Sequence, residues 1–148
     1  MVYQGNLAKS GPVAALRPGF VLVVDDEPFF AGAATEMLLH AGYLATFALD
    51  PKAALRELET NPDIDLLLTD IVMRGMDGFT LAQRAQEIRP GIRVIYSSSH
   101  IELARSLTAA GDGYDAIIEK PFRQDRLIDA IKIALAPSRP VTRQRFGA

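Results

Sequence analysis

Short, mostly apolar segments alternate with longer amphipathic ones along most of the chain. The apolar segments are rich in β-branched residues and are typical of buried strands. They span Phe20 to Val24, Tyr43 to Phe47, Asp65 to Thr69, Ile92 to Ser97 and Ala116 to Ile118. The stretches between them favour helices, over Pro28 to Ala41, from Pro51 onward after a capping Asp50, and over Gly78 to Ile88, Ile101 to Ala110 and Gln124 to Leu135. This alternation predicts an α/β fold with a five-stranded parallel sheet covered by helices on both faces.

Composition separates one folded region from two short ends. Residues 1–19 contain several Gly and Pro without any sustained period, which predicts a flexible leader. Residues 137–148 predict a flexible basic tail that carries Arg139, Arg143 and Arg145. The single domain expected over residues 20–136 holds 11 basic residues against 18 acidic ones. That acidic balance disfavours general nucleic-acid binding, which needs a basic face.

Cysteine usage and hydropathy exclude several other classes of protein. The 148 residues contain no cysteine, so a disulfide scaffold and a thiolate metal site are excluded. No apolar run approaches the roughly 20 residues that cross a bilayer, and no export signal follows Met1. We therefore expect a cytoplasmic protein without membrane association.

Polar residues that can carry chemistry follow four of the predicted strands. Asp25 and Asp26 follow the first strand, Asp70 the third, Ser98 lies at the end of the fourth, and Lys120 follows the fifth. Open α/β sheets bind ligands at this edge. Clustered carboxylates repel one another unless a proton or cation neutralises them. With only oxygen ligands, the predicted site suits Mg²⁺, or alternatively Mn²⁺, better than zinc.

This combination of residues is suited to phosphoryl transfer. An aspartate can act as the nucleophile and form an acyl phosphate, while a metal ion and Lys120 offset charge on the transferred group. Each residue also has a purely structural interpretation, since Asp25 and Asp26 could form a turn or cap a helix and Ser98 could cap the next one. Their common position at one sheet edge favours a functional site.

Four sequence motifs closely resemble the receiver domain of two-component response regulators. They are VLVVDDE at residues 21–27, LLLTDIVMRGMDGF at 66–79, RVIYSSSH at 93–100 and IIEKPF at 117–122. The resemblance extends from Phe20 to about Ala136. It implies a flavodoxin-like, doubly wound (βα)5 fold with strand order 2-1-3-4-5.

The resemblance also assigns roles to individual residues. It implies that Asp70 is the phosphoacceptor and that Ser98 and Lys120 bind the phosphoryl group. The implied metal ligands are Asp25, Asp26, Asp70 and the backbone carbonyl of Val72. Pro121 matches the family's Lys-Pro peptide, usually cis, which would aim Lys120 into the site.

Several positions depart from the family pattern. Arg74 stands where the family commonly has Pro, and its cation could reach the phosphoryl oxygens. Ile117 occupies the switch position where Tyr or Phe is common, and the nearby Tyr114 could substitute for it. Val72 and His100 match the positions that tune dephosphorylation in the family.

The resemblance implies a single-domain response regulator that accepts a phosphoryl group on Asp70 from a histidine kinase or phosphotransfer protein. Phosphorylation would switch the binding of a separate downstream protein through the face formed by residues 101–110, 116–118 and 124–135, a face that also makes homodimers in many receivers. We expect no turnover enzyme, only assistance to its own phosphorylation and dephosphorylation.

Other functions remain open at this stage. A phosphate relay or sink, or a receiver fold that binds partners independently of phosphorylation, would use the same fold. A phosphatase of the haloacid-dehalogenase type would need a second Asp at position 72, where this chain has Val. A flavodoxin-like nucleotide or flavin binder would need a Gly-rich loop after the first strand, which is missing.

Overall fold

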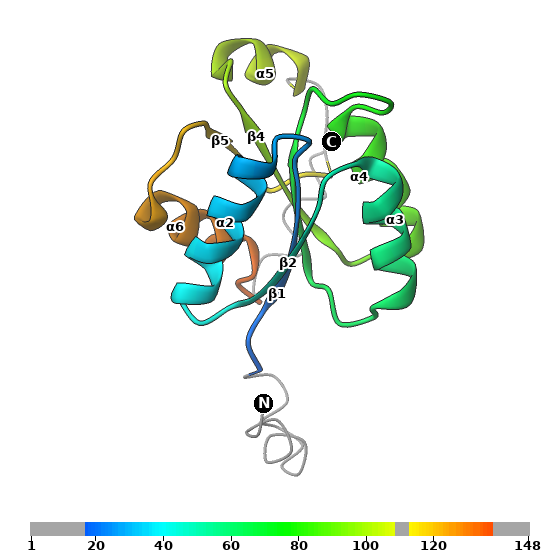
Figure 1. Ribbon diagram of the computed structural model, residues 1–148, viewed down its shortest axis with the longest axis vertical. Coiled ribbons are helices and arrows are strands. Elements are labelled where there is room, and N and C mark those ends of the chain that lie inside the picture. The colour runs from blue at the N-terminus through cyan, green and yellow to red at the C-terminus, as the bar shows by residue number, and fades with distance from the viewer. Residues whose placement is uncertain (1–16, 109–112, 138–148) are drawn as a thin grey trace.

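The computed structural model describes residues 17–108 and 113–137 as an α/β domain (Figure 1). Its parallel strands are β1 (Phe20–Val24), β2 (Leu44–Ala48), β3 (Leu66–Asp70), β4 (Arg93–Ser98) and β5 (Ala116–Glu119). Its helices are α2 (Pro28–His40), α3 (Pro51–Thr60), α4 (Gly78–Ile88), α5 (Ile101–Thr108) and α6 (Gln124–Ala134). The strand order β2-β1-β3-β4-β5 confirms the predicted doubly wound topology.

The sheet is buried on both faces, which explains why its strands are almost continuously apolar. Leu22 and Val24 of β1 pack in one core cluster with residues of α3, α4 and α5. Val21 and Val23 point the other way, into a second cluster built with α2 and α6. Figure 1 shows α2 and α6 on one side of the sheet and α3 and α4 on the other.

Local capping signals set the helix starts as predicted. Asp50 precedes Pro51, and its side chain accepts a hydrogen bond from the backbone N–H of Ala53 at 2.8 Å. Asp77 does the same for Thr80 at the start of α4, also at 2.8 Å. Such caps satisfy backbone donors that have no partner within the helix.

Strands β2, β3 and β4 each begin and end one residue later than predicted. The ladder pairs Phe20 with Leu44 and Val21 with Leu66, so Asp65 falls just before β3. The carboxylate of Asp65 instead accepts a hydrogen bond from the N–H of Phe20 and pairs with Arg17 at 3.0 Å. With this shift Asp70 is the last residue of β3, and its backbone pairs with Ser97 of β4.

The predicted ends of the chain lie largely outside the described residues. This applies to residues 1–16 of the predicted leader, to the predicted end of α5 at Ala110, and to the arginines of the predicted tail. Within 17–108 and 113–137, none of the helices is long and apolar enough to cross a membrane.

Candidate functional site

Three carboxylates meet at the carboxyl end of the two central strands. Asp25 and Asp26 directly follow β1, and Asp70 ends the neighbouring strand β3. Each contributes an oxygen, and these oxygens all lie within 4.8 Å of one another. Asp25 is buried and the other two are partly buried. Such a cluster is stable only with cationic partners nearby.

Lys120 supplies one of these partners from the end of β5. Its Nζ lies 2.8 Å from Oδ2 of Asp25 and 3.5 Å from Oδ2 of Asp70. The side chains of Lys120 and Asp25 are only 7% and 6% exposed, so their ion pair is shielded from water. The backbone N–H of Lys120 donates to the carbonyl of Ser98 at 2.8 Å, and the Lys120–Pro121 peptide bond is cis. The fold thus brings together acids and a lysine that are far apart in sequence.

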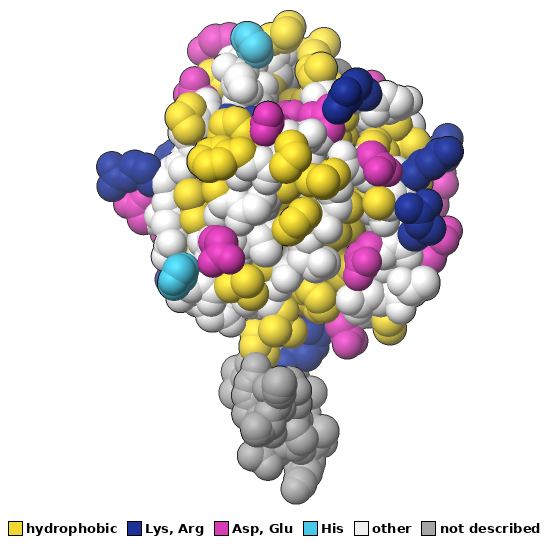
Figure 2. Space-filling model, viewed as in Figure 1, with side chains coloured by type: hydrophobic (Ala, Val, Ile, Leu, Met, Phe, Trp, Pro, Cys, Tyr) yellow, Lys and Arg dark blue, Asp and Glu magenta, His cyan; other side chains and the backbone are white. Residues whose placement is uncertain are grey.

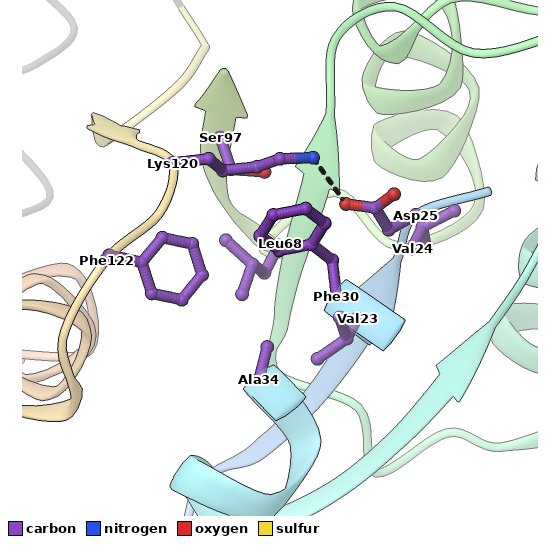
Figure 3. Close-up of a pocket in the computed structure, with 9 residues that line it drawn as sticks. All are labelled: Val23, Val24, Asp25, Phe30, Ala34, Leu68, Ser97, Lys120 and Phe122. Carbon is purple, nitrogen blue, oxygen red and sulfur yellow. Dashed lines mark hydrogen bonds and ion pairs between the residues drawn. The ribbon is translucent and has the colours of Figure 1, made fainter. Parts of the chain in front are cut away.

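The aromatic ring of Phe30 also contacts the ammonium group of Lys120. The Nζ of Lys120 lies 4.4 Å from the ring centroid of Phe30, within the range of a cation–π interaction. Figure 3 shows Phe30 and Phe122 around the small pocket beside the Lys120–Asp25 pair. The adjacent Phe29 instead is 75% exposed. Sequence reasoning missed the contact of Phe30 with Lys120, because no local pattern connects residues this far apart in the chain.

Arg74 supplies a second cation, to Asp26. Its Nε lies 3.5 Å from Oδ2 of Asp26, and its backbone N–H donates to the same oxygen at 3.3 Å. The Arg74 side chain is 87% exposed and that of Asp26 is 24% exposed. In this structure the arginine therefore pairs with a predicted metal ligand.

Burial raises the pKa of Asp70 above its ordinary value of 3.8. The positive charge of Lys120 works in the opposite direction, and the negative charge of Asp25 adds to the increase. The site therefore disfavours the ionised form of Asp70 unless further positive charge is present.

The donor set of the cluster fits a hard divalent cation. It offers carboxylate oxygens and no sulfur or imidazole, which is the preference of Mg²⁺ and Mn²⁺. Three carboxylates exceed the two cations that contact them, so the site retains negative charge for such an ion. Val72, two residues after Asp70, is 76% exposed. Its backbone carbonyl stays a predicted ligand.

Ser98 lies at the carboxyl end of β4 and is buried. Its Oγ accepts a hydrogen bond from the backbone N–H of His100 at 2.9 Å, just before α5 begins. His100 itself is exposed. The serine thus forms a local turn just before α5, whereas the structural interpretation of the sequence was a cap on that helix. Its hydroxyl proton is not used in that bond.

The residues at the predicted switch position pack on the core that faces α3 and α4. Ile117 pairs with Tyr96 across the β4–β5 ladder and contacts that core cluster. Tyr114 also packs there, with its ring centroid 5.6 Å from that of Tyr96. Tyr96 in turn contacts Phe79 edge-on at 5.0 Å, and burial is the main reason that its pKa rises to about 12. Tyr114 therefore belongs to an aromatic cluster with Tyr96 and Phe79.

Comparisons with known proteins agree with this geometry. A family model described as the response regulator receiver domain matches residues 21–132. The transcriptional regulatory protein GlrR of Escherichia coli (strain K12) is 32% identical over 130 residues, which are 88% of this chain and 29% of that protein. The response regulator receiver protein CpdR of Brucella abortus (strain 2308) is 30% identical over 112 residues, which are 76% of this chain and 92% of that protein.

Solved structures give the same result. A CheY-like receiver domain protein from Methanospirillum hungatei JF-1 superposes with a TM-score of 0.70 at 30% identity, covering 78% of this chain and 91% of that one. The response regulator TrrA from Thermotoga maritima, in complex with Mg²⁺ and BeF, superposes with a TM-score of 0.70 at 26% identity, covering 79% and 99%. The chain spans only 26% to 29% of the length of the first three curated relatives it matches. The family match over most of the chain, on a fold with the same strand order, shows that this chain belongs to the response regulator receiver domains of two-component systems.

Proposed function

We propose that this receiver accepts a phosphoryl group on Asp70 in a magnesium-dependent reaction. The observation that supports it best is the placement of the Asp70 carboxylate between two other acids and the Nζ of Lys120, 3.5 Å away. A carboxylate nucleophile needs neighbouring cations, because both it and the incoming phosphoryl group are negatively charged. The site combines a buried lysine with an oxygen-rich cluster suited to a metal ion.

The reaction can be written with its atoms balanced. An oxygen of Asp70 attacks the phosphorus of a phosphohistidine, an O–P bond forms, and the P–N bond breaks. The nitrogen that leaves takes up a proton and regenerates histidine on the donor. Asp25, Asp26, Asp70 and the Val72 carbonyl would hold the ion, which supplies a Lewis acid for the phosphoryl oxygens when it is bound. Lys120 neutralises charge on the transferred group.

The output that we propose is a change of partner binding. A phosphoryl group adds a charge of about −1.5 to −2 and three acceptor oxygens beside Lys120 and Ser98. Lys120 directly follows β5 and Ser98 ends β4, and the chain continues from them into α6 and α5. Those helices carry large exposed apolar side chains, at Leu103 and Leu107 of α5 and Ile133 of α6. An apolar surface of this kind suits a protein partner.

The partners are proposed at the level of class. The donor would be a histidine kinase or a phosphotransfer protein, and the recipient of the signal a separate protein or a second copy bound on the α5–β5–α6 face. We propose no enzymatic turnover beyond the receiver's own phosphorylation and dephosphorylation. The Mg²⁺–BeF complex of TrrA, a protein with the same fold, supports magnesium as the ion.

Intact-protein mass measurement after incubation with acetyl phosphate tests the proposal. We expect one phosphoryl adduct that forms with Mg²⁺, is absent after chelation, and is released by hydroxylamine, as an acyl phosphate should be. Asp70→Asn should abolish it, whereas Asp63→Asn, a change to an exposed carboxylate after α3, should leave it intact. An unchanged adduct in Asp70→Asn, or no adduct in the unsubstituted protein, would refute the assignment.

A further inference from the structure

Asp26, one of the three acids that could hold a metal ion, already has a cation beside its carboxylate. Both contacts of Arg74, from the backbone N–H at 3.3 Å and from Nε at 3.5 Å, go to Oδ2 of Asp26. Lys120 contacts the other two carboxylates, Asp25 and Asp70. Each acid of the cluster is thus paired with a cation of the chain.

The two cations differ in how easily they can leave. Lys120 is almost fully buried and is held by Asp25 at 2.8 Å and by the ring of Phe30. The Arg74 side chain is 87% exposed, so water can solvate its guanidinium as soon as it releases Asp26. Exposed ion pairs of this kind are weak and sensitive to salt. Of the two cations, Arg74 is therefore the one that a metal ion can displace more easily.

These contacts depend on the residue type at position 74. A proline there could make neither contact, because it has no backbone N–H and no charged side chain. The arginine therefore adds to this cluster a positive charge that a proline could not provide. A guanidinium and a divalent ion beside one carboxylate repel each other, so the binding of one opposes the binding of the other.

We propose that Arg74 is a tethered counter-ion that competes with the divalent cation for Asp26 and so weakens metal binding. The inference rests on the proposed function, because it takes the carboxylate cluster as the metal site. Arg74 is a positioning residue in this account: it sets the magnesium concentration at which the site becomes competent. In the metal-bound protein its guanidinium is released to solvent.

Calorimetric titration of Mg²⁺ into the protein at low ionic strength tests this competition. Arg74→Gln removes the charge but keeps the backbone N–H, and we expect it to lower the Kd for Mg²⁺ about two- to fivefold, the range of an exposed ion pair. Arg74→Lys keeps a cation and should bind Mg²⁺ like the unsubstituted protein. Arg56→Gln removes the same charge from the exposed surface of α3 and is the matched control.

Salt and side-chain NMR give two further readouts. Raising the ionic strength should narrow the difference between Arg74→Gln and the unsubstituted protein. The Nε–H resonance of Arg74 should move toward the position of a free arginine as Mg²⁺ is added. An unchanged or higher Kd in Arg74→Gln, or an equal gain in Arg56→Gln, would overturn the inference while leaving the metal site intact. Failure of every variant and of the unsubstituted protein to bind Mg²⁺ would instead overturn the proposed function.

Discussion

Phe30 is the residue whose role depends most on the three-dimensional structure. It lies in the first turn of α2, and its ring contacts the ammonium group of Lys120 from the far end of the chain. A buried cation–π contact of this kind contributes up to about 2 kcal/mol. It also restricts the lysine to the side of the site that faces Asp25 and Asp70.

Replacing the ring with an aliphatic side chain should therefore loosen Lys120. We expect Phe30→Leu to lower the free energy of unfolding by about 1–2 kcal/mol and to slow phosphorylation by acetyl phosphate, whereas Phe30→Tyr should do neither. The side-chain methylene protons of Lys120 should lose their ring-current shift in Phe30→Leu only. Phe29→Leu, which changes the exposed neighbouring ring, is the control. Identical spectra for Lys120 in Phe30→Leu and the unsubstituted protein would contradict this role.

Asp70 makes a second prediction at the same scale, from its raised pKa. Between the ordinary value of 3.8 and the higher value in the fold, the folded protein binds more protons than the unfolded chain. The stability contribution of Asp70 therefore falls as pH rises through that interval and stays low above it. Without divalent ions, Asp70→Asn should be more stable than the unsubstituted protein at neutral pH.

Urea unfolding over a pH series, with a chelator present, measures this difference. The advantage of Asp70→Asn should shrink as the pH falls toward 3.8, because the folded protein then protonates the aspartate. A lower stability of Asp70→Asn at neutral pH would contradict this prediction. It would mean that the attraction of Lys120 for the ionised Asp70 exceeds the combined cost of burial and of repulsion by Asp25.

The start of α4 is the element that most tightly constrains the site. Gly78 donates its N–H to the carbonyl of Ile71 at 2.7 Å, which folds the loop after Asp70 back onto β3. A Cβ on Gly78 would overlap the backbone carbonyl oxygen of Asp70. The helix and the end of the strand can therefore approach this closely only with glycine here.

Alanine substitutions at two helical glycines test this constraint. Gly78→Ala should lower the free energy of unfolding by about 1–3 kcal/mol and weaken Mg²⁺ binding, because the end of β3 must move. Gly32→Ala, inside α2 with open space at the Cβ position, should instead raise the free energy of unfolding by about 0.5–1 kcal/mol. Circular dichroism during urea unfolding measures both. Unchanged stability and Mg²⁺ affinity in Gly78→Ala would contradict the constraint.

Local signals explain which elements the sequence predicts well. The caps at Asp50 and Asp77 act within three residues, and both helices begin where predicted. The starts of β2 and β3 depend on their register with β1, which no local pattern contains, and each differs by one residue. Strand alternation and connection length were enough to predict a parallel sheet covered on both faces, because parallel crossovers leave few arrangements. The strand order itself was implied by the family resemblance and is confirmed by the structure.

Some features of the site could likewise be predicted from the sequence, and others could not. Asp25, Asp26, Asp70 and Lys120 could be grouped because they all follow strands of one sheet, and the structure places them together. The contacts of Phe30 with Lys120 and of Arg74 with Asp26 could not be predicted, because they depend on side-chain directions across separate elements. The sequence showed an arginine at position 74 in place of the usual proline. It did not show which carboxylate this arginine would contact.

Across the whole molecule, charge and apolar surface favour protein partners. Figure 2 shows acidic, basic and apolar side chains interspersed over one face, without an extended basic patch there. The large exposed apolar residues of α5 and α6 lie on the elements that follow Ser98 and Lys120. The proposed switch would therefore act on this surface through the two short connections that follow Ser98 and Lys120.

Amide NMR with Mg²⁺ and beryllofluoride, a mimic of the acyl phosphate, tests the central claim that Asp70 controls this surface. We predict shifts at Asp70, Ser98 and Lys120 that spread into α5 and α6 and that are lost in Asp70→Asn. Shifts confined to the site would contradict the proposed switch and leave a phosphate relay or sink. No magnesium-dependent response at all would contradict phosphorylation control and leave a receiver fold that binds its partners without it.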